Sequence, residues 1–303
     1  MKLPNLKHLH YLVALYQEQH FVKAAQHCHV SQSTLSTAIQ NIEEQFGAQL
    51  LEREHKTFVF TPLGIELVVR SKALLAEAHE FVDFAQSAGD WQGGKLKIGV
   101  IPTIAPFMFA GMIKQVSTHL PKVHLELQED TTANLLTQLN EGAVDLLILA
   151  LPMATPGCKQ LVIGHDPFHL IAHSDLLKSL PTPLEMSSLP KQSIFLLHQE
   201  HCMTGHAVSA CGLQHSEQIS SLAASSLYTL IQLADSKLGF TFMPELAIQS
   251  QILSATALQS LPSEASAYRE IGLVWRNGTT RVRLFRYLAE LFAPLTPIPT
   301  FAK

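Results

Sequence analysis

The sequence has little basic charge, few cysteines and no apolar run long enough to cross a membrane. Its longest apolar run, Leu146 to Ala154, falls well short of the roughly 20 residues that a membrane-spanning helix needs. The first eight residues lack the apolar core and the small-residue cleavage site of a secretory signal. These absences predict a cytoplasmic protein that makes no membrane contact.

The charge balance and the missing motifs narrow the function further. The formal net charge is −4 at pH 7 with histidine neutral, so a contact with DNA must be local rather than driven by a global basic field. The sequence contains no G-x-G-x-x-G, no G-x-S-x-G and no H-E-x-x-H, which mark common nucleotide, hydrolase and zinc-protease sites. We predict that the protein is not an enzyme and needs no cofactor.

Only four cysteines occur in 303 residues, and they are of two kinds. Cys28 and Cys158 have no spaced partner and are predicted to be buried apolar side chains. Cys202 and Cys211 lie nine positions apart in a segment that also carries four histidines, namely His198, His201, His206 and His215. Because a cytoplasmic protein normally keeps its thiols reduced, an oxidisable pair of this kind indicates regulation.

The spacing of Cys202 and Cys211 predicts a switch. Alanine and valine at 207, 208 and 210 permit a helix from Thr204 to Cys211. Nine positions of helix span roughly 13 Å, at about 1.5 Å per residue. A disulfide needs its two Cα atoms within about 7 Å. The two thiols therefore cannot join unless the segment unwinds, so oxidation would change the local fold.

The first 61 residues show the pattern of three helices and a hairpin. Helices are predicted over 6–16, 21–27 and 32–46, the last with Ser31 as its N-cap and Gly47 as its stop. Strands at 50–53 and 58–61 would form a wing. Two helices joined by a tight turn place one helix in the major groove of DNA. The side chains predicted to contact DNA are Gln32, Ser33, Thr34, Ser36, Thr37 and Gln40 on the helix, and Arg53 and Lys56 on the wing. The alternative role of this unit is a helical cap or a dimerisation piece.

The segment 62–91 is rich in alanine and leucine and has almost no helix breakers after Gly64. An amphipathic helix of this length is expected to pair with another helix, most simply one from a second chain. Packing on its own domain is the alternative. The residues from Asp90 to Gly94 interrupt the pattern and mark a domain boundary.

Strands and helices alternate from residue 95 onward, with strands at 95–101, 123–128 and 146–151 and helices at 105–119 and 133–141. This order predicts a mostly parallel sheet with helices on both faces. Ligands of such folds bind beyond the carboxyl ends of strands, which indicates Thr103, Thr132 and, across a cleft, the region of His201 and Cys202. Helix capping is the alternative role of the threonines. Three arginines of the last predicted helix, at 281, 283 and 286, are predicted to form a solvated face.

Five short motifs run in order through the N-terminal part. They are Ala24-Ala25, Val30-Ser31-Gln32-Ser33-Thr34-Leu35-Ser36, Ile42-Glu43, Leu50-Leu51-Glu52-Arg53 and Phe60-Thr61-Pro62-Leu63-Gly64. In these motifs the sequence resembles the LysR-type transcriptional regulators. The resemblance implies a winged helix-turn-helix over 1–61, a dimerising linker helix over 62–91, and an α/β effector domain over 92–303 that resembles periplasmic binding proteins. It divides that domain into subdomain I, 92–164 and 267–303, and subdomain II, 165–266.

The same resemblance implies a homodimer or homotetramer on pseudo-palindromic promoter DNA. Gln40 and Asn41 stand where many relatives carry basic residues. This difference predicts weak non-specific affinity for DNA and a modest dependence on salt, for which binding by several copies would compensate.

The pieces Ile101-Pro102-Thr103, Thr132, His201-Cys202, Ala207 and Cys211 resemble the peroxide-sensing members of that family. The resemblance implies that hydrogen peroxide or another oxidant converts Cys202 to a sulfenic acid, which Cys211 captures as a disulfide. The rearranged oligomer would then recruit RNA polymerase as an activator. Thr103 and Thr132 would help to hold the peroxide, with His201 and His206 beside the thiol.

One departure concerns the charge near the first thiol. Thr204 and Gly205 stand where the peroxide-sensing relatives carry arginine and aspartate. A permanent positive charge is therefore missing from this stretch, and an imidazole such as that of His206 supplies only a conditional one.

Three other interpretations of the segment 198–215 stay open. Its imidazoles and thiols suit zinc or copper, but no C-x-x-C or paired H-x₃-H spacing supports a metal site, and none is predicted. A second interpretation has the cysteines lining a cleft for a small-molecule effector without redox chemistry. The third is a catalytic Cys202–His201 pair, which is disfavoured because a DNA-reading unit on a hydrolase would be unusual.

Overall fold

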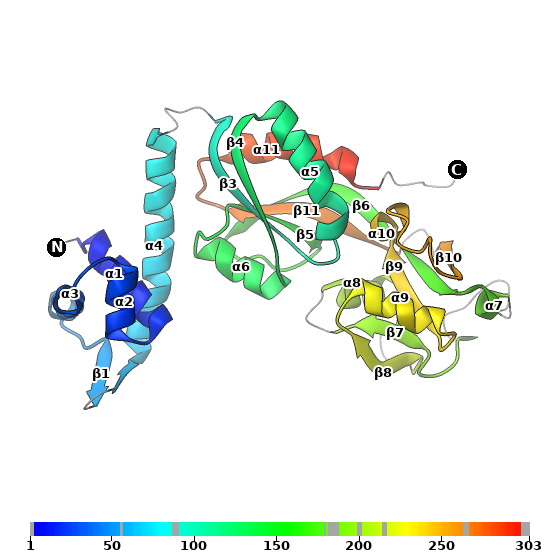
Figure 1. The fold of residues 1–303 in the computed structure, drawn as a ribbon, viewed down its shortest axis with the longest axis horizontal. Helices are drawn as coiled ribbons and strands as arrows, with labels where there is room; N and C mark the ends of the chain where they lie inside the picture. The colour runs from blue at the N-terminus through cyan, green and yellow to red at the C-terminus, as the bar shows by residue number, and fades with distance from the viewer. Residues whose placement is uncertain are drawn as a thin grey trace. The chain divides into compact units, whose positions relative to one another are not determined.

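The computed structural model describes residues 3–54, 57–86, 91–178, 180, 188–198, 202–213, 217–262 and 267–297. The chain divides into two compact units, which are described separately: residues 1–89 with 140–143, and residues 90–139 with 144–303 (Figure 1). Among the described residues, no helix combines the length and the apolar character that crossing a membrane requires.

The N-terminal unit begins with three helices and a two-stranded wing. These elements are α1 (Leu6–Glu18), α2 (Phe21–His27), α3 (Gln32–Phe46), β1 (Leu51–Glu54) and β2 (Thr57–Phe60). The oxygen of Ser31 accepts a hydrogen bond from the amide of Thr34, and Gly47 ends α3 with a φ of 64°. Such a side-chain cap and a left-handed glycine fix the two ends of a helix. The predicted helix-turn-helix is confirmed.

The long helix α4 (Pro62–Gln86) has two surfaces of different kind. Val68 is buried in the core of the N-terminal unit, and Leu67 and Leu75 pack against that core. The first part of the helix therefore packs on its own unit. Six large apolar side chains of α4 are exposed, namely Leu63, Ile65, Val69, Leu74, Phe81 and Val82.

The second unit is built on one mixed sheet in the order β4-β3-β5-β11-β6-β9-β7-β8, with β10 paired to β6. Its strands are β3 (Gly93–Val100), β4 (Lys122–Glu129), β5 (Leu146–Leu151), β6 (Cys158–His173), β7 (Ile194–Leu197), β8 (Ile219–Ala224), β9 (Phe240–Pro244), β10 (Leu258–Pro262) and β11 (Tyr268–Arg276). Its helices are α5 (Ala105–His119), α6 (Thr132–Asn140), α7 (Ser174–Leu177), α8 (Cys202–Ala210), α9 (Leu227–Asp235), α10 (Glu245–Gln249) and α11 (Val282–Phe292).

The expectation of a mostly parallel sheet is wrong at its centre. The outer strands pair in parallel, β3 with β4 and β5, and β7 with β8 and β9. The long strands β6 and β11 run antiparallel to each other, because the chain passes from one half of the unit to the other along β6 and returns along β11. A pattern of alternating strands and helices does not reveal which strands are neighbours, so this reversal was not predicted.

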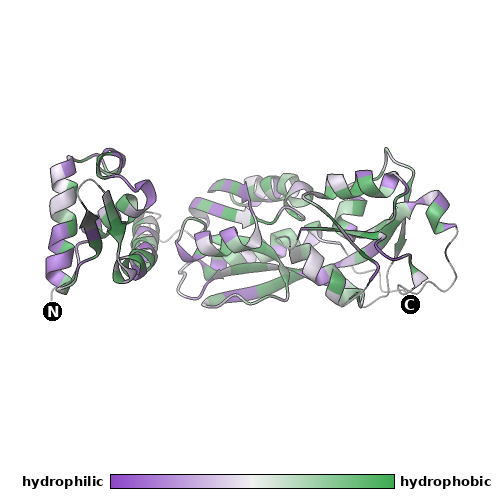
Figure 2. Cartoon of the chain, turned by 90° about the horizontal axis from the view of Figure 1, so that it is seen from below, coloured by the Kyte–Doolittle hydropathy of each residue, from purple (hydrophilic) through white to green (hydrophobic). Residues whose placement is uncertain are grey.

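Two apolar cores define two α/β subdomains. The first surrounds β3 and β5, and the side chains of β5 are fully buried from Leu146 to Ala150. The second surrounds β7 and β9. Figure 2 colours the inner strands of this unit as hydrophobic. In the first subdomain α5 and α11 cover one face of the sheet and α6 the other (Figure 1). The domain boundaries proposed from the sequence stay predictions.

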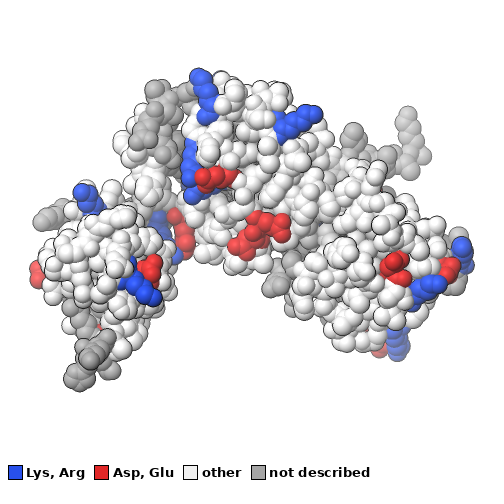
Figure 3. Space-filling model, viewed as in Figure 1, with Lys and Arg blue, Asp and Glu red and all other residues white. Residues whose placement is uncertain are grey.

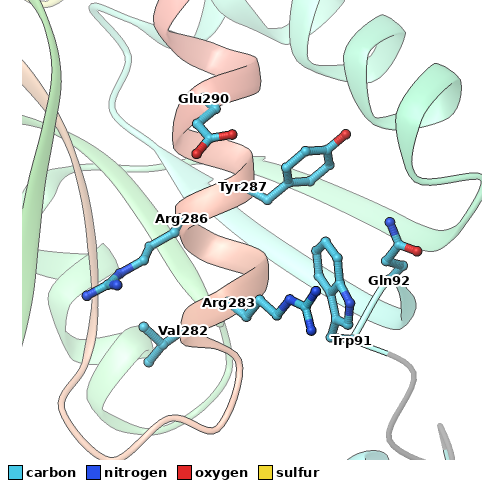
Figure 4. Close-up of a pocket in the computed structure, with 7 residues that line it drawn as sticks. All are labelled: Trp91, Gln92, Val282, Arg283, Arg286, Tyr287 and Glu290. Carbon is cyan, nitrogen blue, oxygen red and sulfur yellow. The ribbon is translucent and has the colours of Figure 1, made fainter.

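The three arginines near α11 do not form one solvated face. The guanidinium of Arg281 donates to the carbonyl of Lys95 at 2.6 Å and pairs with Asp145 at 3.6 Å. Arg283 lies over the indole of Trp91, 4.4 Å from its centroid, at one side of an open cleft of about 660 Å³ (Figure 4). Of the three, only Arg283 and Arg286 are exposed. The expectation is therefore wrong for Arg281, which anchors the start of β3.

Candidate functional site

The outward face of α3 is the candidate DNA-reading surface. Leu35, Ile39 and Ile42 are buried on its inner face. The residues predicted to contact DNA lie on the other side: Gln32, Ser33, Thr34, Thr37 and Gln40 are exposed and Ser36 is half-buried. Hydroxyl and amide groups in this position can exchange hydrogen bonds with base edges and phosphates.

Fixed charge is sparse around this surface. The side chain of Arg53 and all of Lys56 lie outside the described residues. On the face shown in Figure 3, Lys and Arg are scattered among acidic residues rather than gathered into one basic patch.

The second candidate site lies between the two subdomains and is organised by a buried arginine. Arg269 of β11 stands directly opposite Asp166 of β6 in the sheet. Its Nε donates to Asp166 Oδ2 at 3.0 Å, its Nη2 forms an ion pair with the same oxygen at 2.9 Å, and both side chains are 0% exposed. Nη1 of the same guanidinium donates to Thr103 Oγ1 at 2.7 Å, and Nη2 also donates to the Thr103 carbonyl at 3.0 Å.

The carboxyl of Asp166 accepts hydrogen bonds from more than one element. The amide of Leu246, at the start of α10, donates to its Oδ1 at 2.9 Å. Burial raises the pKa of Asp166 above its ordinary value, and the charge of Arg269 and these hydrogen bonds offset only part of that rise. Because the Arg269 Nε and the Leu246 amide both donate to its oxygen atoms and an arginine keeps its proton, the carboxylate is the form that this geometry fits.

His206 of α8 joins this site from the second subdomain. Burial lowers the pKa of His206 and the charge of Arg269 lowers it further, whereas the nearby backbone of Ala150 on β5 opposes the change. The imidazole is therefore neutral at neutral pH and bridges the two subdomains without carrying charge.

The two predicted threonines differ. Thr103 is held by Arg269, whereas the Oγ1 of Thr132, at the start of α6, is buried and has no hydrogen-bond partner among the described residues. A buried hydroxyl of this kind is costly unless a bound molecule pairs with it. Sequence reasoning missed Arg269 and Asp166. The available signal was weak, because β6 also carries Lys159, and β11 also carries Glu270 and Arg276.

The helix predicted between the cysteines is present and longer than expected. α8 starts at Cys202, and the amide of Cys211 still donates to Ala207 at 2.9 Å, so the backbone is helical from one cysteine to the other. The helix ends in a Schellman motif: Leu213 donates to Val208 at 2.9 Å across Gly212, whose φ is 65°.

The groups around the first thiol are only partly described. His201 and the side chain of Cys202 lie outside the described residues. Cys211 is in the thiol form, half-buried against the second core. Among the residues that the structure describes, no group of three or more His, Cys, Asp or Glu side chains is arranged to hold a metal ion.

Cys28 and Cys158 behave as packing residues. Each is half-buried against an apolar core, Cys28 in the N-terminal unit and Cys158 in the first subdomain. Burial raises the pKa of both thiols, and the charge of Arg276 only partly opposes this for Cys158. A raised pKa disfavours the reactive thiolate.

Comparison with known proteins defines the class. The family profile of the LysR substrate binding domain matches residues 89–295, and that of the lysR family of bacterial regulatory helix-turn-helix proteins matches residues 6–65. The chain belongs to the LysR family of bacterial transcriptional regulators.

Within this family, the chain is similar to regulators of more than one kind. It is 33% identical to the HTH-type transcriptional regulator EstR of Acinetobacter baylyi, over 97% of this chain and 98% of that protein. It is 31% identical to the DNA-binding transcriptional dual regulator OxyR of Escherichia coli, over 94% of each.

Solved structures of relatives agree with this assignment. A full-length OxyR variant from Pseudomonas aeruginosa superimposes with a TM-score of 0.74 at 28% identity, covering 96% of this chain and 95% of that one. The reduced regulatory domain of OxyR2 from Vibrio vulnificus has a TM-score of 0.65 at 43% identity, covering 67% of this chain and 96% of that one.

The buried ion pair yields the first prediction. Asp166→Asn leaves the guanidinium of Arg269 buried without a counter-charge, so we expect the effector domain to lose about 3–5 kcal/mol of stability. Urea unfolding followed by tryptophan fluorescence measures this, because both tryptophans, Trp91 and Trp275, belong to this unit. The control is Asp175→Asn, which removes an exposed, solvent-screened pair with Lys237 and should change the stability far less. Equal losses in the two variants would contradict the prediction.

His206 yields a prediction about pH. The pKa of His206 in the folded protein is below the ordinary value of 6.5. As the pH falls below 6.5, this histidine is therefore protonated more readily in the unfolded chain than in the folded one. The contribution of neutral His206 to the free energy of unfolding is complete above pH 6.5. It is lost as the pH falls towards the pKa of His206 in the folded protein. We expect His206→Gln to weaken the acid-induced loss of stability in the same urea assay. The exposed His124→Gln should leave the pH dependence as it is, and an identical pH profile for wild type and His206→Gln would show the assignment to be wrong.

Proposed function

We propose that this LysR-family regulator senses hydrogen peroxide or another oxidant through Cys202 and Cys211. The observation that carries the proposal is the unbroken helical backbone between the two cysteines. At about 1.5 Å per residue it holds their Cα atoms roughly 13 Å apart. A disulfide between them requires α8 to unwind, which converts a chemical event into a change of shape.

The surroundings of α8 favour a thiolate at Cys202. This residue is the first of the helix, where the partial positive charge of the helix dipole stabilises an anion. His206 lies one helical turn further on the same side, and the charge of Arg269 acts on His206. In this proposal Arg269 of β11 is the fixed positive charge nearest to the site in place of one at 204 or 205, although Asp166 partly neutralises it.

The proposed chemistry needs only the oxidant and the two thiols. The Cys202 thiolate attacks one oxygen of hydrogen peroxide, the O–O bond breaks, and hydroxide leaves and takes up a proton to become water. Cys202 is then a sulfenic acid. The thiolate of Cys211 attacks that sulfur, a disulfide forms, and the hydroxyl leaves as a second water. Two electrons pass from the two cysteines to peroxide.

α8 is built so that it can unwind. Gly205 has no atom within 4 Å of the position of a Cβ, and glycine disfavours helix by about 0.5–1 kcal/mol relative to alanine. The helix is anchored by the buried Met203 and Ala207 and by the hydroxyl of Thr204, which donates to the Leu197 carbonyl at 2.8 Å. These few anchors are what oxidation has to overcome.

The output is proposed to be transcription activation at pseudo-palindromic promoter DNA, with RNA polymerase as the recruited partner. α3 would read base edges through Gln32 to Gln40, with Arg53 and Lys56 on the wing. The exposed apolar side chains of α4 support assembly into a homodimer or homotetramer, because a stripe of this kind is stable in water only when it is covered.

A second candidate is a regulator that binds a small-molecule effector between the subdomains and performs no redox chemistry. The unpaired buried hydroxyl of Thr132 favours a ligand there, and the similarity to EstR is as extensive as the similarity to OxyR. Peroxide itself would also satisfy this hydroxyl. The two candidates differ in whether Cys202 is needed.

The decisive prediction concerns Cys202. Cys202→Ser should abolish the response of DNA binding to peroxide while it leaves reduced-state DNA binding intact, because serine keeps the shape but has no redox chemistry. Cys158→Ser is the control and should respond like the wild type. Mass spectrometry after graded peroxide treatment should find the Cys202–Cys211 disulfide in the wild type. A full response in Cys202→Ser would contradict the redox proposal and favour the second candidate, a regulator that binds a small-molecule effector.

Gly205 gives a quantitative prediction. Gly205→Ala meets no steric obstacle and should stabilise the helical, reduced form by about 1 kcal/mol. The disulfide becomes easier to reduce, so its potential should rise by about 20 mV, since about 30 mV corresponds to 1.4 kcal/mol for two electrons. Titration with glutathione buffers measures the shift. Gly278→Ala lies outside the helix, also meets no obstacle, and should leave the potential unchanged. A potential that does not move in Gly205→Ala would mean that α8 stays folded on oxidation.

A further inference from the structure

A cleft lies beside the candidate DNA-reading helix, within the N-terminal unit. It has a volume of about 420 Å³ and is formed between the start of α1 and the outward face of α3. Lys7, His8 and Tyr11 line it from α1, and Ser33, Thr34, Thr37 and Asn41 line it from α3. Three of these α3 residues, Ser33, Thr34 and Thr37, also belong to the surface proposed to read DNA. A duplex placed against α3 therefore brings one of its strands to this cleft.

The charges of the cleft are all of one sign and come from α1. Lys7 is exposed and its ammonium has no ion-pair partner among the described residues, and His8 stacks on Tyr11 with 6.4 Å between ring centroids. The residues that α3 contributes are uncharged, and no carboxylate lines the cleft. Tyr11 is the one other titratable group in the lining.

This local charge matters because the proposed DNA-binding domain has no net charge. Residues 1–61 contain five basic and five acidic residues, so their formal charges cancel. The basic residues are Lys2, Lys7, Lys23, Arg53 and Lys56, and the acidic ones are Glu18, Glu43, Glu44, Glu52 and Glu54. The same stretch contains six histidines: His8, His10, His20, His27, His29 and His55. Affinity for DNA depends mainly on the number of phosphates that basic side chains neutralise. Histidine is the available source of additional positive charge.

We infer that the cleft between α1 and α3 seats a phosphate of the DNA backbone, held by the ammonium of Lys7 and the protonated imidazole of His8. The inference rests on the proposed DNA-binding function and adds to it two contacts and a dependence on pH. A phosphate close to an imidazole favours its protonated form. DNA binding by this head then takes up a proton, so its affinity falls as the pH rises.

The first test measures the salt dependence of binding to a mixed-sequence DNA duplex, which reports phosphate contacts rather than base reading. Each phosphate contact contributes about 0.9 to the slope of log affinity against log salt concentration, so Lys7→Gln should reduce the slope by about one. Lys159→Gln removes the same charge from an exposed position in the effector domain and should keep the wild-type slope. A wild-type slope in Lys7→Gln overturns the proposed contact.

The second test measures binding to the same duplex as a function of pH. The wild type should lose affinity as the pH rises through the range in which histidine titrates, and His8→Gln should take up about one proton fewer on binding. His8→Lys, which keeps a positive charge at all these pH values, should restore the affinity at high pH. His124→Gln, in the effector domain, should behave like the wild type. A His8→Gln variant with the full pH dependence overturns the role of His8.

The two levels of proposal are separable. Unfolding curves of the full-length variants establish that each one folds. A folded wild type that binds no DNA at any salt concentration overturns the proposed function together with this inference. A wild type that binds DNA, with variants that match it in both tests, overturns the inference alone.

Discussion

The effector domain depends on one buried ion pair, that of Arg269 with Asp166. The two residues face each other on the strands that carry the chain from one subdomain to the other and back. Transfer of two charges into a dry interior costs several kcal/mol for each ion unless their hydrogen-bonding groups are satisfied. Here the remaining donors and acceptors go to Thr103 on one side and to Leu246 on the other. The pair therefore fixes the crossing strands, the loop after β3 and the start of α10 in one arrangement.

This fixed centre contrasts with α8, the helix that the proposed switch would unwind. Arg269 cannot leave Asp166 without a large loss, whereas α8 is held by a few apolar contacts and contains a glycine. His206 links α8 to this ion pair, because both the charge of Arg269 and the backbone of Ala150 act on the pKa of its ring. A rigid electrostatic centre beside a weakly held helix is an arrangement in which a change at one thiol alters the local structure and leaves the fold intact.

The local elements could be predicted from the sequence, and the long-range pairing could not. The bounds of α2, α3, α5 and β5 follow from caps, stops and apolar periodicity, which are local signals. β6 could not be predicted as one long strand because Gly164, Asp166 and Pro167 interrupt the pattern of a strand. Thr103, Thr132 and His206 were predicted as site residues, and whether they hold peroxide stays a prediction. Arg269 was missed because its partner lies 103 residues away, and only the register of β6 and β11 brings them together.

The Schellman cap of α8 has a thermal consequence. Leu213, which closes that cap, is 1% exposed, as is Met203 near the other end of the helix. Unwinding exposes this apolar surface to water, and hydration of apolar surface raises the heat capacity. In the proposed switch, the enthalpy of the change from helix to disulfide would then vary with temperature. A cell that warms or cools would shift the balance between the two forms even at a constant supply of oxidant.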